Sequence, residues 1–389
     1  MKIAMLTEWR EPLVWWWQVY AKYLCDFLVR TYGCKIDVFT RAFIDDNWEK
    51  VVENKEYAPG WMVYRIWPVW SFFSSLYRIA SLFKTTIVLY KKAKQEKYDI
   101  IHAHALLAWL PAWIVGKMLH IPVVYTVHGT MHMDVKKKWL FYYAEKFLVA
   151  YIPYDLEISV SHKVLDHNPR SKRVVIIYPG IDKAKYLWTC PKYDGMNYLF
   201  VGRIDRQKWL SYLVKAIGNI DVSLLDNQKF HLNILGDGPD RKDIESLVDE
   251  VERRKYITFL WKTSFERIVQ EYKSNQLFIL PSLAEWQPVV VFEAFANKLP
   301  VIVTDVWDNS YIINKDNGFL VPPWNIDELQ KVIEKTLTMD IQDLEQMWMN
   351  WYTMTQERFW REIIVAQIYS EYIILNFWLH ILFVCGMRE

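Results

Sequence analysis

The chain is poor in glycine and cysteine. Among 389 residues there are only 12 glycines, although ordinary usage of about 7 % would give roughly 27. The four cysteines, Cys25, Cys34, Cys190 and Cys385, show no paired spacing. They therefore predict neither a disulfide framework nor a zinc site, and they favour a reducing compartment such as the cytoplasm.

Long apolar runs are also missing. None reaches the roughly 18 residues that a membrane-spanning helix needs. The longest candidate, residues 372–385, is interrupted by Asn376 and His380. Met1 leads directly into an expected strand, without a signal peptide. We therefore expect a cytoplasmic protein, peripheral at most to the inner face of a membrane.

Charge is present but unevenly distributed. The formal net charge is only +2, yet residues 1–185 hold 26 Lys and Arg against 17 Asp and Glu. This excess favours an anionic partner, which can be a lipid surface, a charged glycan or nucleic acid. Two basic segments, 89–97 and 134–148, fit either a solvated helix face or docking on an anionic membrane. No nucleic-acid-binding module is recognisable, so nucleic acid is not expected as a partner.

The hydrophobic pattern predicts an α/β protein. Short apolar runs alternate with amphipathic segments, which is typical of parallel sheets covered by helices on both faces. The expected strands lie in two series: residues 2–7, 35–40, 98–105, 121–129 and 155–161, then 197–203, 230–238, 256–261, 275–280 and 299–305. We predict two doubly wound, Rossmann-like domains, 1–187 and 188–354. A C-terminal helix, 355–389, is expected to pack back on the first domain.

Ligands of such sheets bind beyond the carboxyl ends of the strands, and two facing sheets form a cleft. Arg203 and Lys208 lie between an expected strand and helix in "LFVGRIDRQKW". A guanidinium and an ammonium at a helix start suit a diphosphate, although two solvated surface cations are the ordinary alternative. Gly236 and Gly238 in "LNILGDGP" form either a tight turn at the ligand or an ordinary turn.

Two carboxylates and one histidine also follow expected strands. Glu285 lies in a strand-to-helix loop, and Glu293 lies about two turns along the following helix. One carboxylate can face a sugar, where it stabilises an oxocarbenium-like centre, and the other a ribose. The plain alternative is a helix with an acid near its N-terminus. His128 fits either a sugar hydroxyl or a satisfied loop position.

The remaining histidines predict no further chemistry. His102 and His104 alternate on one expected strand, and we interpret both as structural. His128, His132 and Asp134 match no standard ligand spacing, so no metal site is expected.

The combination of these motifs resembles the retaining glycosyltransferases of family 4 (glycosyl transferases group 1), which have the GT-B fold. The resemblance covers most of the chain. Its segments are "MKIAMLTEWREP", "HAH", "TVHG", "VIIYPGID", "FVGRIDRQK", "ILGDGP", "NQLFILPSLAE", "FEAFANKLPVIVTD" and "NGFLVPP". No D-x-D motif occurs, which fits a family that needs no metal.

This resemblance implies transfer of a hexose, with retention, from a UDP- or GDP-linked sugar to a glycan or lipid-linked acceptor, without a cofactor. Arg203 and Lys208 would hold the donor diphosphate, and Glu293 the nucleotide ribose. Glu285 and His128 would act at the donor sugar. The other implied donor-binding positions are Val289, Val290, Gly236, Trp15 and Trp16.

Tryptophan stands where this family usually has glycine. The chain has 21 tryptophans, and seven occupy such positions: Trp15, Trp16, Trp209, Trp261, Trp286, Trp307 and Trp324. A bulky residue forced into a glycine conformation costs ~1–3 kcal/mol. Either the local backbones have shifted, or the chain is an altered version of a natural enzyme, or some of these rings stack on sugars. We predict that Trp15, Trp16 and Trp286 fill space meant for phosphate and sugar, which impairs activity.

Two rival functions use the same architecture. One is a sugar-nucleotide epimerase or phosphorylase, and the other is a catalytically inactive nucleotide-sugar-binding protein. The R-x4-K and E-x7-E pairs favour a transferase, whereas the tryptophans favour the inactive protein.

Overall fold

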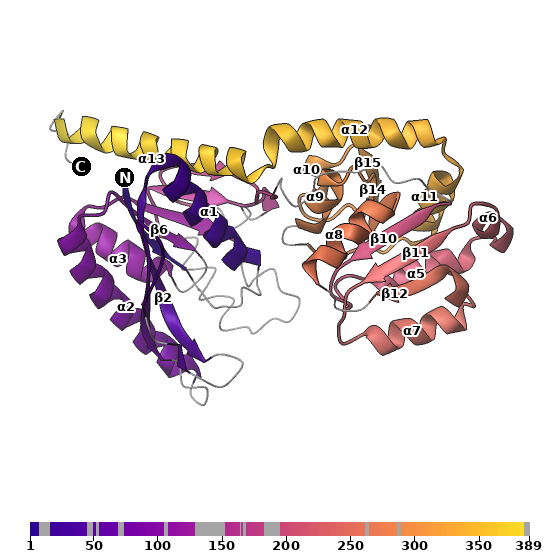
Figure 1. Cartoon of the computed structure of the whole chain (residues 1–389), viewed down its shortest axis with the longest axis horizontal. Coiled ribbons are helices and arrows are strands. Elements are labelled where there is room, and N and C mark those ends of the chain that lie inside the picture. Colours follow the sequence, from indigo (N-terminus) through magenta and orange to yellow (C-terminus); the bar gives the residue numbers. More distant parts are fainter. Residues whose placement is uncertain are drawn as a thin grey trace. The chain divides into compact units, whose positions relative to one another are not determined.

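The computed structural model consists of two compact units, called unit 1 (Met1–Gly180 with Arg361–Glu389) and unit 2 (Ile181–Trp360) (Figure 1). The residues that the structure describes are 1–7, 16–44, 50–51, 54–68, 74–104, 108–128, 152–163, 165, 169–182, 195–260, 264–285 and 289–384. Trp15, His132, Asp134, Cys190, Trp261 and Trp286, and the basic segment 134–148, lie outside them.

Unit 1 is built on one twisted sheet. Its strands are β1 (Lys2–Leu6), β2 (Lys35–Ile44), β3 (Lys50–Val51), β4 (Lys55–Ala58), β5 (Trp61–Pro68), β6 (Ile100–His104), β7 (Val123–Val127), β8 (Leu156–Ser159) and β9 (Val174–Ile176). The order is β4-β5-β2-β1-β6-β7-β8-β9, with β3 beside β2. The pairs β2–β3 and β4–β5 are antiparallel, and the others are parallel. The chain leaves β1 toward β2 and later returns to pair β6 with β1, so the strand order reverses between β1 and β6.

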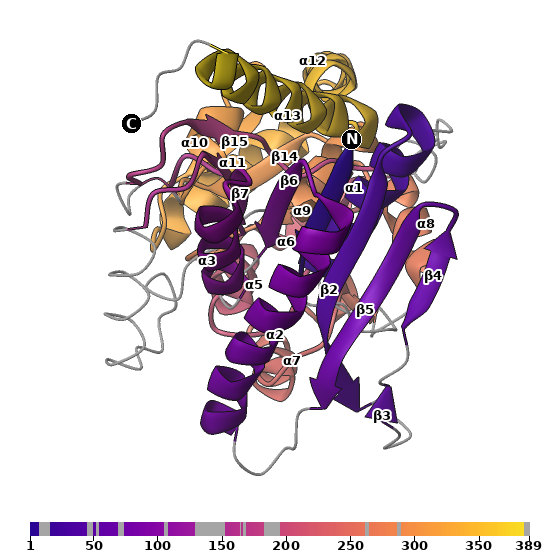
Figure 2. The ribbon, with the colours of Figure 1, turned by 90° about the vertical axis from the view of Figure 1, so that its left-hand side faces the viewer.

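Helices cover both faces of this sheet. Successive side chains of a strand point to opposite faces, and β1 places apolar side chains on both. Ile3 and Met5 face α1 (Trp16–Tyr32) and α13 (Arg361–Val384). Ala4 and Leu6 face α2 (Ser74–Glu96) and α3 (Trp109–Leu119), which run beside each other in Figure 2. The expectation of a parallel sheet buried on both faces is therefore confirmed for unit 1.

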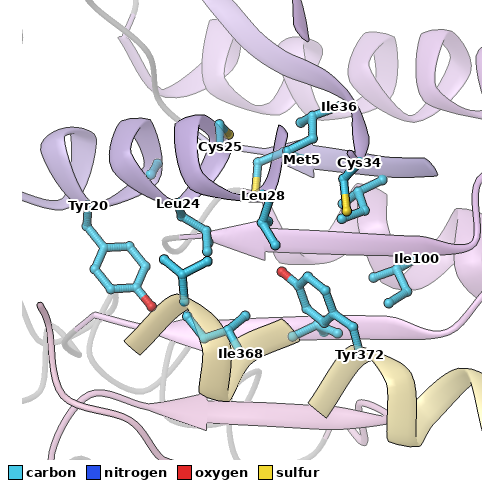
Figure 3. Packing of buried hydrophobic residues seen from close by; sticks show 14 of the residues in the cluster. Met5, Tyr20, Leu24, Cys25, Leu28, Cys34, Ile36, Ile100, Ile368 and Tyr372 are labelled. Carbon is cyan, nitrogen blue, oxygen red and sulfur yellow. The ribbon is translucent and has the colours of Figure 1, made fainter. Parts of the chain in front are cut away.

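Helix α13 is part of the unit 1 core although it lies at the end of the chain. Figure 3 shows Ile368 and Tyr372 among side chains of α1, including Leu24 and Leu28. Its outer side makes a two-pronged contact, in which Arg173 donates to both carboxylate oxygens of Glu371 at 2.6 and 2.9 Å. Within the described ranges, no helix is both long and apolar enough to cross a bilayer.

Unit 2 holds a second parallel sheet. Its strands are β10 (Asn197–Val201), β11 (His231–Leu235), β12 (Ile257–Leu260), β13 (Leu277–Leu280), β14 (Val301–Thr304) and β15 (Gly318–Val321). Their order is β12-β11-β10-β13-β14-β15. The chain builds outward from β10 to β12 and then crosses back to place β13 on the other side of β10. This reversal between β10 and β13 is the point at which open α/β sheets form crevices.

The helices of unit 2 follow its strands in alternation. They are α5 (Leu210–Asn219), α6 (Val222–Asn227), α7 (Arg241–Glu250), α8 (Phe265–Ser274), α9 (Val289–Ala296), α10 (Asn309–Ile312), α11 (Ile326–Thr338) and α12 (Ile341–Arg358). Several begin at a side-chain cap that satisfies a free backbone N–H. Ser264 accepts from Arg267 N, and Asn325 accepts from Glu328 N. Local sequence thus sets where these helices start.

All ten expected strands are present. Five further strands were not predicted from the sequence: β3, β4, β5, β9 and β15. The strands β3 and β9 have only two and three residues, and β4, β9 and β15 lie at sheet edges. Short or polar edge strands carry a weak hydrophobic pattern, because one side of them faces water. The strand β5 is different, because it has eight residues, lies between β4 and β2 and buries Trp61, Val63 and Ile66.

Candidate functional site

Lys208 and Glu285 meet at the strand reversal of unit 2. Lys208 lies in the loop after β10 and Glu285 in the loop after β13, the two strands that flank the reversal. Lys208 Nζ forms an ion pair with Glu285 Oε1, with side-chain exposures of 17 % and 5 %. The hydroxyl of Ser282 donates to the same carboxylate oxygen. Residues 77 positions apart therefore form one buried charged centre.

The two loops are held together by further hydrogen bonds. Gln207 Nε2 donates to the carbonyl of Ala284 at 2.7 Å, and Leu283 N donates to the carbonyl of Gln207 at 2.8 Å. Asp205 Oδ1 accepts from the backbone N–H of Gln207 and of Lys208, at 3.1 and 3.3 Å. Sequence reasoning missed Asp205, Gln207 and Ser282. Only the aspartate gave a signal, since Asp commonly bonds to the backbone two residues ahead in a turn.

Gly236 is required because the loops after β10 and β11 pack backbone against backbone. A Cβ at Gly236, whose φ is +150°, would lie 1.8 Å from the carbonyl oxygen of Gly202. At Gly238 it would lie 2.0 Å from the carbonyl oxygen of Ile204. No side chain fits at such distances, so these glycines allow the approach that places the Arg203 loop.

Arg203 lies at the surface of this region. Its Nε is 3.5 Å from Asp205 Oδ2, and the side chain is 67 % exposed. The same aspartate therefore holds the loop of Lys208 through one oxygen and faces Arg203 with the other. An exposed guanidinium can turn toward an anionic ligand at little cost, because its pairing at the surface is worth only ~0–1 kcal/mol.

Glu293 lies on α9 and is positioned by a tyrosine that the sequence reading missed. The hydroxyl of Tyr272, on α8, is 3.0 Å from Glu293 Oε2 and 3.2 Å from the carbonyl oxygen of Val290. Tyr272 is fully buried, whereas Glu293, Val289 and Val290 are half-buried. No spacing rule links residues 272 and 293, since they approach only when α8 and α9 pack.

In unit 1, His128 follows β7 directly and lies beside His104, the last residue of β6. His128 Nε2 is 2.9 Å from His104 Nδ1, and the rings are stacked with centroids 5.2 Å apart. The ring of Tyr20 meets His128 edge-on at 5.0 Å. Burial lowers the pKa of His128 to about 3 and the pKa of His104 well below its usual value. Both rings are therefore neutral at physiological pH, and His128 can act only through hydrogen bonds.

His102 is a satisfied core residue. Its Nδ1 is 2.5 Å from the Tyr372 hydroxyl on α13, and its Nε2 is 2.7 Å from Thr126 Oγ1. Burial lowers its pKa to about 3. The interpretation of His102 as structural therefore agrees with its contacts, whereas His104 contacts a candidate site residue.

Trp16, Trp209, Trp307 and Trp324 are the tryptophans at expected glycine positions whose backbones the structure describes, and three of these four are left-handed. The φ angles are +52° at Trp209, +56° at Trp307 and +66° at Trp324. Trp209 directly follows Lys208 and packs its ring 3.5 Å from Tyr212 and 3.7 Å from Trp324. A left-handed conformation costs a bulky residue roughly 1–2 kcal/mol, whereas glycine adopts it readily. Trp16 begins α1, but its side chain, like Trp15 and Trp286, lies outside the described residues.

Comparison with known proteins identifies the family. The sequence model "Glycosyl transferases group 1" matches residues 192–350, and "Glycosyltransferase Family 4" matches residues 18–185. The chain is 30 % identical over 270 residues to the UDP-Gal:alpha-D-GlcNAc-diphosphoundecaprenol alpha-1,3-galactosyltransferase of Escherichia coli, covering 63 % of this chain and 67 % of that protein. It is 31 % identical over 274 residues to the alpha-D-kanosaminyltransferase of Streptomyces kanamyceticus, covering 64 % and 70 %.

Solved structures agree on the fold. Sucrose-phosphate synthase from Thermosynechococcus elongatus matches with a TM-score of 0.78 at 22 % identity, covering 96 % of this chain and 98 % of that one. Anabaena HepE in complex with UDP matches with a TM-score of 0.72 at 18 % identity, covering 95 % and 99 %. The predicted GT-B fold is confirmed. The chain belongs to family 4 of the glycosyltransferases, within glycosyl transferases group 1.

Proposed function

We propose that this glycosyltransferase moves a hexose, with retention and without a metal, from a UDP- or GDP-linked sugar to a glycan or lipid-linked acceptor. The observation that carries the proposal is the buried Lys208–Glu285 pair at the strand reversal of unit 2. A crevice at such a reversal is the usual ligand site of doubly wound sheets. The Escherichia coli relative is named for a UDP-sugar donor and a diphosphoundecaprenol-linked acceptor, which supports both substrate classes.

The charges of the site suit a leaving nucleoside diphosphate. Breaking the bond from the sugar to the diphosphate places negative charge on the leaving oxygen. Lys208 is already held by Glu285 and by the turn at Asp205, so little reorganisation is needed for it to meet that charge. Arg203, which is accessible on the same loop, adds a second cation.

The remaining residues serve the other parts of the donor. Glu293, half-buried and held by Tyr272, binds the ribose through its carboxylate, while the first turn of α9 at Val289 and Val290 meets the nucleotide. Glu285 also stabilises positive charge that develops at the sugar, and His128 binds a sugar hydroxyl. These roles follow from the family resemblance and from the chemistry of each group.

A donor-hydrolysis and transfer screen over UDP- and GDP-sugars tests this function. Lys208→Met and Glu285→Gln should each lower kcat/KM by at least about 100-fold, the worth of ~2.7 kcal/mol of transition-state stabilisation. Lys215→Met is the matched control, because Lys215 is an exposed cation on the following helix α5. The anomeric configuration of the product, read by NMR, tests retention.

The screen also separates the alternatives. Release of sugar from no donor, with UDP or GDP bound in calorimetry, would favour an inactive binding protein. Interconversion of free sugar nucleotides would favour an epimerase. A variant with glycine at positions 15, 16 and 286 tests the predicted pocket filling. Unchanged binding and turnover in that variant would show the idea to be wrong.

A membrane surface is the proposed setting of the acceptor. On α2, Phe83 and Ile87 are 69 % and 55 % exposed. They lie on one helical face with the exposed Lys84, Lys91 and Lys94. Apolar side chains flanked by cations are typical of helices that lie on anionic lipid. The double variant Phe83→Ser and Ile87→Ser should sediment less with phosphatidylglycerol vesicles than the unaltered chain does. Phosphatidylcholine vesicles should bind neither the variant nor the unaltered chain.

A further inference from the structure

We propose that His104 is a positioning residue that, together with Met5, holds His128 in its Nε2–H tautomer. Nδ1 of His128 is then a hydrogen-bond acceptor, matched to a hydroxyl of the donor sugar. The second part of this inference rests on the proposed function, because it takes His128 to contact the donor sugar. The first part concerns only the described contacts of unit 1.

The geometry allows one proton between the two histidines. His104 Nδ1 and His128 Nε2 are 2.9 Å apart, which is a hydrogen-bond distance. A neutral imidazole carries one N–H and one lone pair. One ring must therefore donate and the other accept, and the direction depends on where His104 keeps its own proton.

Met5 decides that direction. His104 Nε2 lies 3.0 Å from the sulfur of Met5, and a thioether sulfur can only accept. A lone pair on Nε2 would face the sulfur lone pairs at this distance and be repelled. The proton of His104 therefore lies on Nε2 and its Nδ1 accepts. His128 must then donate from Nε2, which leaves the lone pair on its Nδ1.

The surroundings make this arrangement rigid and neutral. Met5 and His104 are fully buried on adjacent regions of β1 and β6, and His128 is 8 % exposed. Tyr20 packs edge-on against both imidazoles, at 5.8 and 5.0 Å. Burial keeps the pKa of each ring low, so a doubly protonated His104, which would donate from both nitrogens, is excluded at neutral pH.

This assignment predicts a chemical preference. A ring nitrogen that only accepts binds a hydroxyl as donor, and it rejects a group without a hydrogen to give. The opposite tautomer would present an N–H, and the same hydroxyl would then have to accept instead of donate. A donor sugar in which a group without such a hydrogen replaces that hydroxyl should therefore bind about 5- to 10-fold more weakly, since each 1.4 kcal/mol is a factor of ten.

Long-range 1H–15N NMR on the full chain with labelled histidine reads the tautomer directly, in the absence of donor. His128→Gln identifies the signals of His128 by their disappearance. We expect the Nε2–H pattern for His128 at pH 7.5. An Nδ1–H pattern, or an equal mixture of the two tautomers, would overturn the proposal.

Variants of His104 and Met5 supply a second test, in which the tautomer of His128 and KM for the donor are measured. His104→Asn places an amide oxygen near the position of Nδ1 and should keep His128 in the Nε2–H form. His104→Phe removes the acceptor, so His128 should populate both tautomers. With about half of the molecules in the competent form, KM for the donor should rise about twofold, with a smaller change in kcat. Met5→Leu removes the acceptor for His104 and should partly reproduce the mixture. Circular dichroism confirms folding of each variant.

The two failures are distinguishable. If no donor is turned over by the unaltered chain, the proposed function fails, yet the NMR pattern still decides the tautomer. If transfer is observed and His104→Phe changes neither the His128 signals nor KM for the donor, the positioning role of His104 is wrong while the transferase stands.

Discussion

Lys208→Met and Glu285→Gln remove the two ends of one ion pair, yet the structure predicts unequal losses of stability. In Lys208→Met, the Glu285 carboxylate remains buried, at 5 % exposure. Of its two partners, Lys208 and Ser282, it retains the Ser282 hydroxyl. An uncompensated buried charge costs about 3 kcal/mol. In Glu285→Gln, the amide oxygen still accepts from Ser282, and Lys208, at 17 % exposure, can turn to water. We expect a loss of about 1 kcal/mol there.

The double variant tests this reasoning quantitatively. If the two losses were independent, their sum would be about 4 kcal/mol, but a neutral amide no longer needs the cation. We therefore expect about 2 kcal/mol for the double variant, which is a coupling of about 2 kcal/mol. Urea unfolding at pH 7.5, followed by circular dichroism, measures all three, with Lys215→Met as a control that changes stability by less than about 0.5 kcal/mol. Additive losses within about 0.5 kcal/mol, or equal losses for the two single variants, would refute the argument.

Three further predictions concern stability and donor binding. Lowering the pH from 7.5 to 5.5 should destabilise unit 1 in urea unfolding. In the folded state, burial lowers the pKa of His102 and of His128 to about 3, so both rings stay neutral. In the unfolded chain the same histidines bind protons below about pH 6.5. Each of these histidines lowers the free energy of unfolding by about 1.4 kcal/mol at pH 5.5. An unfolding transition that does not change with pH would contradict the assignment of these buried rings as neutral. Trp209→Gly should cost about 2 kcal/mol in the same assay, because losing a ring that is 7 % exposed outweighs the relief of a left-handed backbone. Trp324→Gly, at 65 % exposure, should change stability by less than about 1 kcal/mol. The reverse order would contradict the argument that burial of the ring, and not the shared left-handed backbone, sets the difference. Tyr272→Phe should raise KM for the donor about fivefold, because it removes the hydroxyl that contacts Glu293. The control Tyr256→Phe, which loses a hydroxyl bond to Asp226, should leave KM unchanged.

The sequence by itself determined the fold class and the family. Apolar runs such as residues 197–203 and 275–280 show their strand character locally, because a strand buried on both faces needs continuous apolar side chains. Gly236 could also be singled out from the sequence, and the structure supplies its reason, since the carbonyl of Gly202 leaves no space for a Cβ. The tryptophans were conspicuous by position, and Trp209, Trp307 and Trp324 have the left-handed backbones that glycine prefers.

Only the tertiary structure decided which of these residues meet. Lys208 and Glu285 are 77 positions apart, and they become neighbours because β13 crosses back to pair with β10. Met5 gave no signal as the partner of His104, since an apolar strand residue has the same pattern whatever its sulfur contacts. Local periodicity encodes whether a segment is a strand or a helix and which of its faces is buried. Contacts between distant side chains depend on strand order and helix packing, which arise only when the whole sheet assembles.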